Sequence, residues 1–255
     1  MSPPESAGQG MILECRNTTA GYGGSPVIVD MSLGVQPGEI VTVIGPNGSG
    51  KSTLLKVLAG HLAPDDGTVY LRDDDITRSS PEERASAGMG FVPQVGDVFT
   101  DMTVTENLEV GGYLMRKRLR ARRIQEVMEI LPEIRSLARR RARNLSGGER
   151  KLVALGRAMV SEPRVLLLDE PTAGLAEPIA ERLMREAMVT LRRAGVAVVL
   201  VEQRARLALE VSDRGYVLVD GEIVYTDAAA KLLEGDRFTE VFFGDVGPQT
   251  AREHG

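Results

Sequence analysis

The residues best suited to chemistry form a glycine-rich run, GPNGSGKS, from Gly45 to Ser52. It matches G-x-x-x-x-G-K-[ST], in which glycines let backbone N–H groups turn toward phosphate oxygens. Lys51 is suited to reach the terminal phosphates of a nucleotide, and the Ser52 hydroxyl to bind Mg²⁺. An accidental glycine turn is the alternative. The predicted nucleotide-binding residues of this segment are Gly45, Pro46, Asn47, Gly48, Ser49, Gly50, Lys51, Ser52 and Thr53.

Two adjacent carboxylates follow a second apolar run, in the sequence VLLLDE from Val165 to Glu170. Open α/β sheets bind ligands at the carboxyl ends of their strands, where this pair would lie. We therefore expect Asp169 to bind Mg²⁺, directly or through water, and Glu170 to act as the general base toward an attacking water. The alternative is that both carboxylates only cap the next helix.

A third candidate site is LSGGE, from Leu145 to Glu149, before the helical pattern of Arg150–Val160. Ser146, Gly147 and Gly148 at a helix start could form a second anion-binding nest, separate from the first. Taken alone, the same residues would be read as an ordinary helix cap.

Together these motifs resemble those of ATP-binding cassette (ABC) ATPases. GPNGSGKS, FVPQ with Gln94, LSGGE and VLLLDEP occur in the family's order and spacing, and the resemblance covers about Met11 to Gly235. It implies ATP and Mg²⁺ as cofactors and ATP hydrolysis as the activity. It also implies that Tyr22, in GYG, stacks on adenine.

Further roles follow from the same resemblance. Gln94 would contact both Mg²⁺ and the attacking water. Ser146, Gly147 and Gly148 would grip the γ-phosphate of ATP held by a second cassette, identical or homologous, so that two cassettes enclose two nucleotides.

Two departures from the common family pattern point to one branch. Ala176 stands where the family commonly has an aspartate, and Gln203, in LVEQ, where it commonly has a catalytic histidine. Both resemble the ATP-binding subunits of importers for branched-chain amino acids and related urea or amide solutes. The implied partners are transmembrane permease subunits and, indirectly, an extracytoplasmic solute-binding protein.

A soluble ABC ATPase of translation or DNA repair is the alternative function. Such proteins usually resemble tandem cassettes or carry long coiled-coil insertions. The interval of 95 positions between Lys51 and Ser146 leaves no room for a long coiled coil, which favours the transporter.

The elements that must position these residues read as an α/β domain with a mainly parallel sheet. Val165–Leu168 and Val196–Val201 lack alternation, as buried strands do. Ile12–Asn17 and Val27–Gly34 are predicted to form an antiparallel β layer. The remaining expected elements are a helix over Ile179–Arg193, a hairpin turn at Asp220-Gly221 between Gly215–Val219 and Glu222–Thr226, and helices over Val104–Met115 and Ala121–Leu131.

The expected organisation is a P-loop ATPase core with a mainly parallel sheet, an antiparallel β layer and a helical subdomain. We expect one ABC cassette over residues 11–235, the helical subdomain over about 79–144 within it, and a C-terminal tail over 236–255.

Composition bounds the function further. With 42% hydrophobic and 26% charged residues the chain is expected to fold around a sizeable core. Its longest mainly apolar run, Ala194–Val201, is far shorter than a membrane-spanning helix needs. No leader sequence is recognisable, and the single cysteine, Cys15, excludes an internal disulfide. We expect a cytoplasmic protein, peripheral on the inner face of the cell membrane.

Charge is unevenly distributed. The chain has a net charge of −5, yet residues 111–143 carry eleven Lys or Arg against three Glu. RKRLRARR, from Arg116 to Arg123, admits three interpretations: a solvated helix surface, contact with anionic lipid headgroups, or nucleic-acid binding. No aromatic residues are interleaved for stacking on bases, so no nucleic-acid partner is expected.

Overall fold

A computed structural model describes residues 10–95 and 98–234. Its central sheet has six strands in the order β10-β9-β3-β8-β7-β6. All neighbours are parallel except the hairpin of β9 with β10. Their bounds are β3 Ile40–Ile44, β6 Met89–Val92, β7 Val165–Asp169, β8 Ala197–Val201, β9 Arg214–Val219 and β10 Glu222–Ala228.

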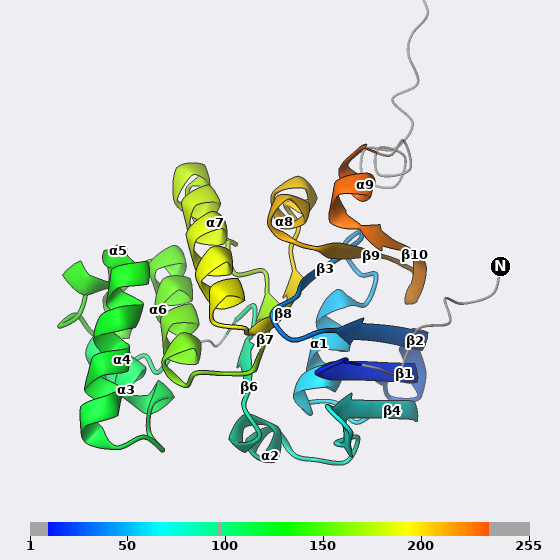
Figure 1. The fold of residues 1–255 in the computed structure, drawn as a ribbon, viewed down its shortest axis with the longest axis horizontal. Coiled ribbons are helices and arrows are strands. Elements are labelled where there is room, and N and C mark those ends of the chain that lie inside the picture. The colour runs from blue at the N-terminus through cyan, green and yellow to red at the C-terminus, as the bar shows by residue number, and fades with distance from the viewer. Residues whose placement is uncertain (1–9, 96–97, 235–255) are drawn as a thin grey trace, which may run out of the picture.

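A second, antiparallel sheet has the order β2-β1-β4-β5 (Figure 1). Its strands are β1 Leu13–Tyr22, β2 Ser25–Val35, β4 Asp66–Leu71 and β5 Asp74–Asp75. The fold class expected from the sequence, a mainly parallel sheet with an antiparallel β layer and helices, is confirmed.

Alternating side chains of the buried strands serve two cores. In β7, Val165 and Leu167 face the core that α1 (Lys51–Ala59) forms between the two sheets. Leu166 and Leu168 face the opposite core, against α6 (Gly147–Val160) and α7 (Glu177–Arg193). Because both faces are covered, the residues of β7 before Asp169 and all those of β8 are apolar.

The remaining helices complete the layers (Figure 1). On one side, α3, α4 and α5 pack against α6, forming a helical group. Near β9 and β10, α8 and α9 pack together. Their bounds are α2 Pro81–Ser86, α3 Val104–Gly111, α4 Lys117–Ile130, α5 Pro132–Ser136, η1 Ala142–Asn144, α8 Ala205–Val211 and α9 Ala229–Glu234.

Some expected boundaries differ from the structure. The segment 79–144 is not helical throughout, because β6 inside it pairs in parallel with β7 of the central sheet. The helix expected to reach Met115 ends at Gly111, where a Cβ would lie 2.1 Å from the Arg157 carbonyl oxygen. The next helix begins at Lys117 rather than Ala121, since Lys and Arg are good helix formers.

The turn predicted at Asp220-Gly221 is confirmed. Both residues have positive φ, 47° and 84°, and the turn joins β9 to β10. A Cβ on Gly221 would lie 2.4 Å from the Val27 carbonyl oxygen, so the turn needs glycine there for space as well as conformation. Within residues 10–95 and 98–234, no helix is both long and apolar enough to cross a membrane. The expected tail, 236–255, lies outside the described residues.

Candidate functional site

The phosphate-binding run lies between β3 and α1, as its strand–loop–helix pattern predicts. Gly48 and Gly50 have φ values of 83° and 103°, which only glycine adopts readily. Gly50 caps α1 without any side-chain hydrogen bond, so the first amides of the helix are open to an anion. A Cβ on Gly45 would lie 2.0 Å from the Leu218 carbonyl oxygen, which excludes a side chain there.

Two buried polar groups in this loop are suited to phosphate. Lys51 is 5% exposed, and its Nζ donates to the carbonyl oxygens of Gly45 at 2.9 Å and Pro46 at 2.7 Å. Burial lowers the pKa of Lys51, and the nearby Glu170 and Asp169 oppose that shift. Ser49 Oγ is buried without a hydrogen-bond partner. A phosphate would give both groups an acceptor, so the donor set fits a nucleotide.

The expected Mg²⁺ ligands adjoin one another at the start of α1 and the end of β7. Ser52 Oγ donates to Asp169 Oδ1 at 3.1 Å. Burial raises the pKa of Asp169, and Glu170 adds to the rise, while the hydrogen bond from Ser52 opposes it. A hydroxyl and a carboxylate oxygen, open to a phosphate-bearing loop, form a suitable donor set for Mg²⁺.

Glu170 lies where three loops meet. Gln94 Nε2 donates to Glu170 Oε2 at 2.7 Å, and Gln203 Nε2 donates to Glu170 Oε1 at 2.9 Å. These residues follow β6, β7 and β8, neighbouring parallel strands whose carboxyl ends meet at one sheet edge. Glu170 itself has a φ of 49°, and its N–H donates to the Val201 carbonyl oxygen at 2.9 Å. The residues expected to catalyse therefore contact one another.

Sequence reasoning missed one carboxylate beside this cluster. Glu202 is 2% exposed and accepts hydrogen bonds from Thr172 N–H at 2.9 Å and Thr172 Oγ1 at 2.7 Å. It also accepts from Gln203 N–H at 3.2 Å. Burial raises the pKa of Glu202, and these hydrogen bonds oppose the rise. The sequence feature that could have revealed Glu202 is its place in LVEQ, next to Gln203. In the structure, Glu202 links the loop after Glu170 to the loop that carries Gln203.

Tyr22, expected to stack on adenine, ends β1 and is 50% exposed. Its hydroxyl accepts a hydrogen bond from Lys56 Nζ at 3.3 Å. Tyr22 lines an open cavity of about 750 Å³ together with Ser52, Gln94 and Asp169. Thr53 is buried in α1, while Pro46 and Asn47 are exposed in the loop before it.

Ser146, Gly147 and Gly148 lie at the start of α6, a different helix from α1, which follows the phosphate loop. Ser146 Oγ accepts from Glu149 N–H at 3.2 Å, and Ser146 N–H donates to Glu149 Oε2 at 2.7 Å, which is a capping box. A Cβ on Gly148 would lie 2.8 Å from Leu175 Cδ2. In the described part of the chain, no hydrogen bond joins this segment to the phosphate loop.

Comparison with known proteins gives consistent matches. The model of the family described as "ABC transporter" matches residues 28–173. The chain is 37% identical to a probable branched-chain amino acid transport ATP-binding protein, LivF, of Archaeoglobus fulgidus, over 89% of this chain and 96% of that protein. It is 39% identical to the high-affinity branched-chain amino acid transport ATP-binding protein BraG of Pseudomonas aeruginosa, over 88% and 95%.

Proteins of export match as well. The chain is 32% identical to the lipopolysaccharide export system ATP-binding protein LptB of Escherichia coli strain K12, over 91% of this chain and 97% of that protein. The similarity therefore reaches ATP-binding proteins of branched-chain amino acid transport and of lipopolysaccharide export.

Two solved structures of ATP-binding cassettes share this fold. The ADP conformation of an ATP-binding cassette of an ABC transporter has a TM-score of 0.80 and 29% identity, over 92% of this chain and 99% of that chain. The dimeric structure of a bacterial ABC transporter cassette has a TM-score of 0.78 and 27% identity, over 85% and 98%.

Proposed function

This chain belongs to the ABC transporter family and is an ATP-binding ATPase subunit of a transporter; on that premise we propose that it drives import of branched-chain amino acids or related small solutes. The relatives named above are ATP-binding proteins of transport or export systems, which favours a transporter over a soluble ATPase of translation or DNA repair.

One observation carries the proposed chemistry: two amide side chains hold the carboxylate of Glu170 beside the phosphate loop. Neither Gln94 nor Gln203 titrates near neutrality, so both can orient a carboxylate and a water without changing charge. A general base must lie within hydrogen-bonding reach of the proton that it accepts. Glu170, with its two carboxylate oxygens fixed, fits that role.

The other residues of the site would bind the phosphates and Mg²⁺ and orient the reacting groups. The open amides of α1 and the ammonium of Lys51 would bind the β- and γ-phosphates of ATP. Ser52 and Asp169, with Gln94, would hold Mg²⁺, which when bound neutralises phosphate charge. Glu170 would accept the proton of the attacking water, while Gln203 orients the carboxylate and the γ-phosphate.

We infer that the working unit is a pair of cassettes. The capping box at Ser146 begins α6, where Ser146 and Gly147 are exposed and Gly148 is buried. This helix differs from α1, which follows the chain's own phosphate loop. That arrangement suits phosphate held by a second cassette, identical or homologous, and the fold neighbour that forms a dimer supports it. A single cassette over residues 11–235, with a tail after it, is part of the same proposal.

The proposed partner on the membrane side is a pair of permease subunits, served by an extracytoplasmic solute-binding protein. The cavity near Gln94 is also lined by Phe91 and Val95, and Val95 is 77% exposed. An exposed apolar group beside the catalytic amide is suited to a protein partner whose movement must reach the site. The chain would then lie on the inner face of the cell membrane.

The direct test is reconstitution of the chain with candidate permease subunits and a candidate solute-binding protein. We expect the assembled complex to hydrolyse ATP faster when the binding protein carries leucine, isoleucine or valine. Stimulation only by a urea or amide solute would instead assign the chain to an importer of such solutes. Copurification with a lipopolysaccharide permease, and no response to amino acids, would overturn import and assign the chain to export.

A further inference from the structure

The turn between α3 and α4 exposes apolar and cationic side chains together. Tyr113 and Leu114 are 76% and 84% exposed, although two backbone hydrogen bonds, from Tyr113 to Val110 and from Met115 to Gly112, order the turn. Three exposed cations follow at once. We call this group the turn patch: Tyr113, Leu114, Arg116, Lys117 and Arg118.

The cations of the turn patch differ from those farther along α4. Arg122 and Arg123 each form an ion pair with Glu126. Among the described residues, no carboxylate lies within ion-pair distance of Arg116, Lys117 or Arg118. Their charge is therefore available to a partner.

Folding of α4 does not explain this placement. Cations near a helix N-terminus oppose the helix dipole, and acidic residues are favoured there. The first turn of α4 nevertheless contains no acid, and Arg116 caps it without a side-chain hydrogen bond. Cations placed unfavourably in an exposed first helical turn point to a role in binding rather than in stabilising the fold.

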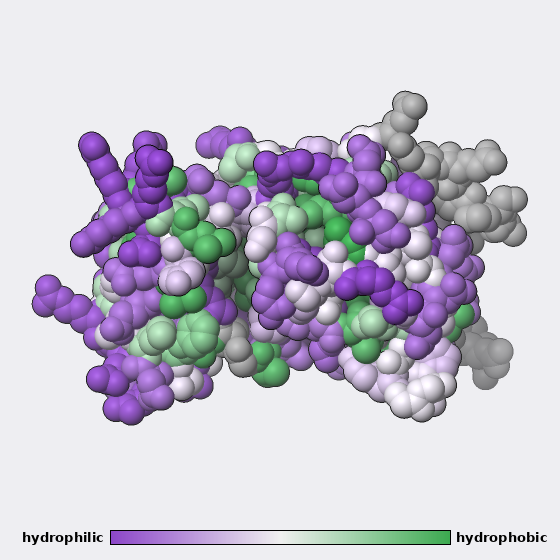
Figure 2. All heavy atoms as spheres, turned by 90° about the horizontal axis from the view of Figure 1, so that it is seen from below, coloured by the Kyte–Doolittle hydropathy of each residue, from purple (hydrophilic) through white to green (hydrophobic). Residues whose placement is uncertain are grey.

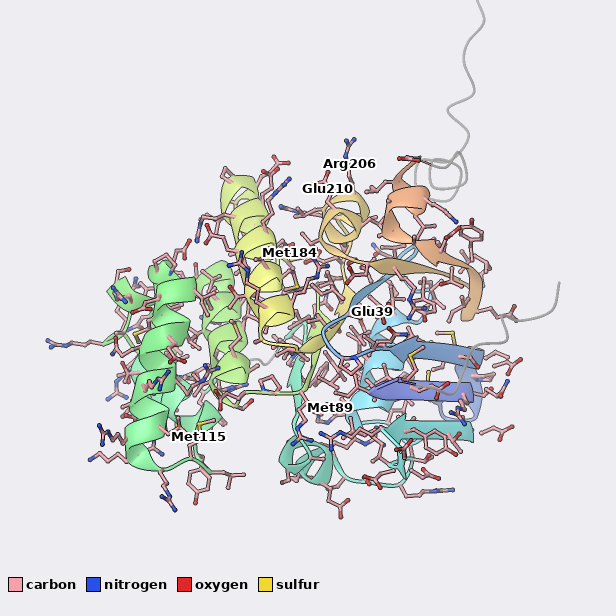
Figure 3. The ribbon with its side chains drawn as sticks, viewed as in Figure 1. Glu39, Met89, Met115, Met184, Arg206 and Glu210 are labelled. Carbon is pink, nitrogen blue, oxygen red and sulfur yellow. The ribbon has the colours of Figure 1, made fainter. Side chains whose placement is uncertain are left out.

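The turn patch lies on the same side of the molecule as the cavity near Gln94. Figure 3 labels Met89, which lines the cavity, and Met115, which adjoins the patch, and both lie in the lower half of the view. Figure 2 views that lower face, where hydrophilic side chains project beside apolar surface over the helical group. If permeases dock at the cavity, the membrane surface lies beside the patch; this step rests on the proposed function.

We propose that the turn patch binds the anionic phospholipid headgroups of the membrane that holds the transporter. Arg116, Lys117 and Arg118 attract the phosphates, and Tyr113 and Leu114 enter the interfacial layer, where amphipathic aromatic and apolar groups are stabilised. Nucleic acid accounts for the cations but leaves the 84% exposed Leu114 without a partner.

Vesicle binding tests this proposal on the full chain without permeases. Vesicles of equimolar phosphatidylglycerol and phosphatidylcholine are compared with pure phosphatidylcholine by cosedimentation. We expect binding only to the anionic vesicles, weakened by salt. Because each cation near such a surface contributes about a fivefold gain, the triple variant R116Q/K117Q/R118Q should lose about 100-fold in partitioning. Leu114→Ser should weaken binding less, with the salt dependence unchanged.

A matched control removes equal charge elsewhere. R185Q/R193Q/R206Q alters exposed residues of α7 and α8, and Arg206 lies at the opposite edge in Figure 3. This variant should bind as the parent does. Because the chain has no tryptophan, Tyr113→Trp supplies a single reporter, whose emission should shift to the blue on anionic vesicles.

Three results would overturn the proposal: equal partitioning onto both kinds of vesicle, equal losses in the two triple variants, or binding of DNA or RNA with none to vesicles. Failure of the proposed function is separable. The chain could bind anionic vesicles through the turn patch and yet assemble with no permease. That result would support lipid binding and contradict the proposed importer function.

Discussion

At the residue scale, Glu170 is held from two sides by amides that come from different loops. In the proposed role as general base, a carboxylate fixed in this way would lose little freedom on accepting a proton, which favours the same geometry in every turnover. The backbone of Glu170, at a φ of 49°, is fixed by the hydrogen bond from its N–H to the Val201 carbonyl oxygen at 2.9 Å.

Glu170→Gln should keep ATP binding and lower turnover by about 100-fold or more, because the amide cannot accept the proton of water. Steady-state hydrolysis by the assembled transporter, with nucleotide binding measured in parallel, checks this. Asp213→Asn, which alters a carboxylate paired with Arg192, serves as a control. Parental turnover in Glu170→Gln would show that another group is the base.

Gln203→Ala should lower kcat more than it raises KM, because in the proposed mechanism its hydrogen bond to Glu170 at 2.9 Å orients the base, which matters chiefly while the γ-phosphate is being transferred. Gln203→His should keep activity and add a pH dependence near an imidazole pKa of about 6.5. The readout is kcat and KM from about pH 6 to 9 for the parent and both variants. An unchanged kcat in Gln203→Ala would show that the Gln203 side chain has no role in catalysis.

Glu202 predicts a pH dependence of stability. Its pKa is raised by burial, so the folded chain binds this proton more tightly than the unfolded chain does. The resulting stabilisation is complete below the unfolded pKa of about 4.3 and is lost as pH rises through the folded pKa. Relative to Glu202→Gln, the parent should therefore be less stable toward urea at neutral pH than at about pH 5. The opposite trend would mean that the hydrogen bonds outweigh burial.

At the element scale, α1 is constrained at its C-terminal end by a buried arginine. Arg84 is 1% exposed, and its Nη1 donates to the carbonyl oxygens of Val57 and Leu58, both at 2.7 Å. Its other donors bind the carbonyl oxygens of Ile76, Thr77 and Ser79. Burial lowers the pKa of Arg84 to about 10. One side chain thus ties the helix after the phosphate loop to the segment that leads into β6 and Gln94.

Arg84→Ala should destabilise the fold by about 3 kcal/mol or more, since it leaves several buried carbonyl oxygens without donors. Arg84→Lys should recover only part of that lost stability, because an ammonium group cannot reach all of the same carbonyl oxygens. Urea unfolding of the three proteins at neutral pH measures both effects. A change within about 0.5 kcal/mol for Arg84→Ala would mean that solvent replaces the lost donors.

At the scale of the whole molecule, the proposed pairing of two cassettes means that one chain alone holds an incomplete site. Specific ATPase activity should rise with protein concentration, or on addition of the partner cassette. Ser146→Arg should block that activity, since it adds bulk and charge at the surface proposed to face the partner, while nucleotide binding to the monomer persists. Activity independent of concentration, in a sample shown to be monomeric, would contradict the paired site.

The amino-acid sequence by itself determined the features that depend on short-range order. The strand, loop and helix around Lys51, the acidic pair after β7 and the turn at Asp220-Gly221 are each encoded within a few neighbouring residues. Local conformational preferences and side-chain spacing suffice for these. Their order along the chain also carried the family resemblance, which the comparisons confirmed.

Only the tertiary structure decided which distant groups meet. Gln94 and Gln203 are 76 and 33 residues from Glu170, and they reach it because β6, β7 and β8 are neighbours in the sheet. The same holds for the contact of Glu202 with Thr172 and for the carbonyl oxygens gathered by Arg84. Such contacts depend on strand order and on the packing of buried faces, which residues far apart in the chain set jointly.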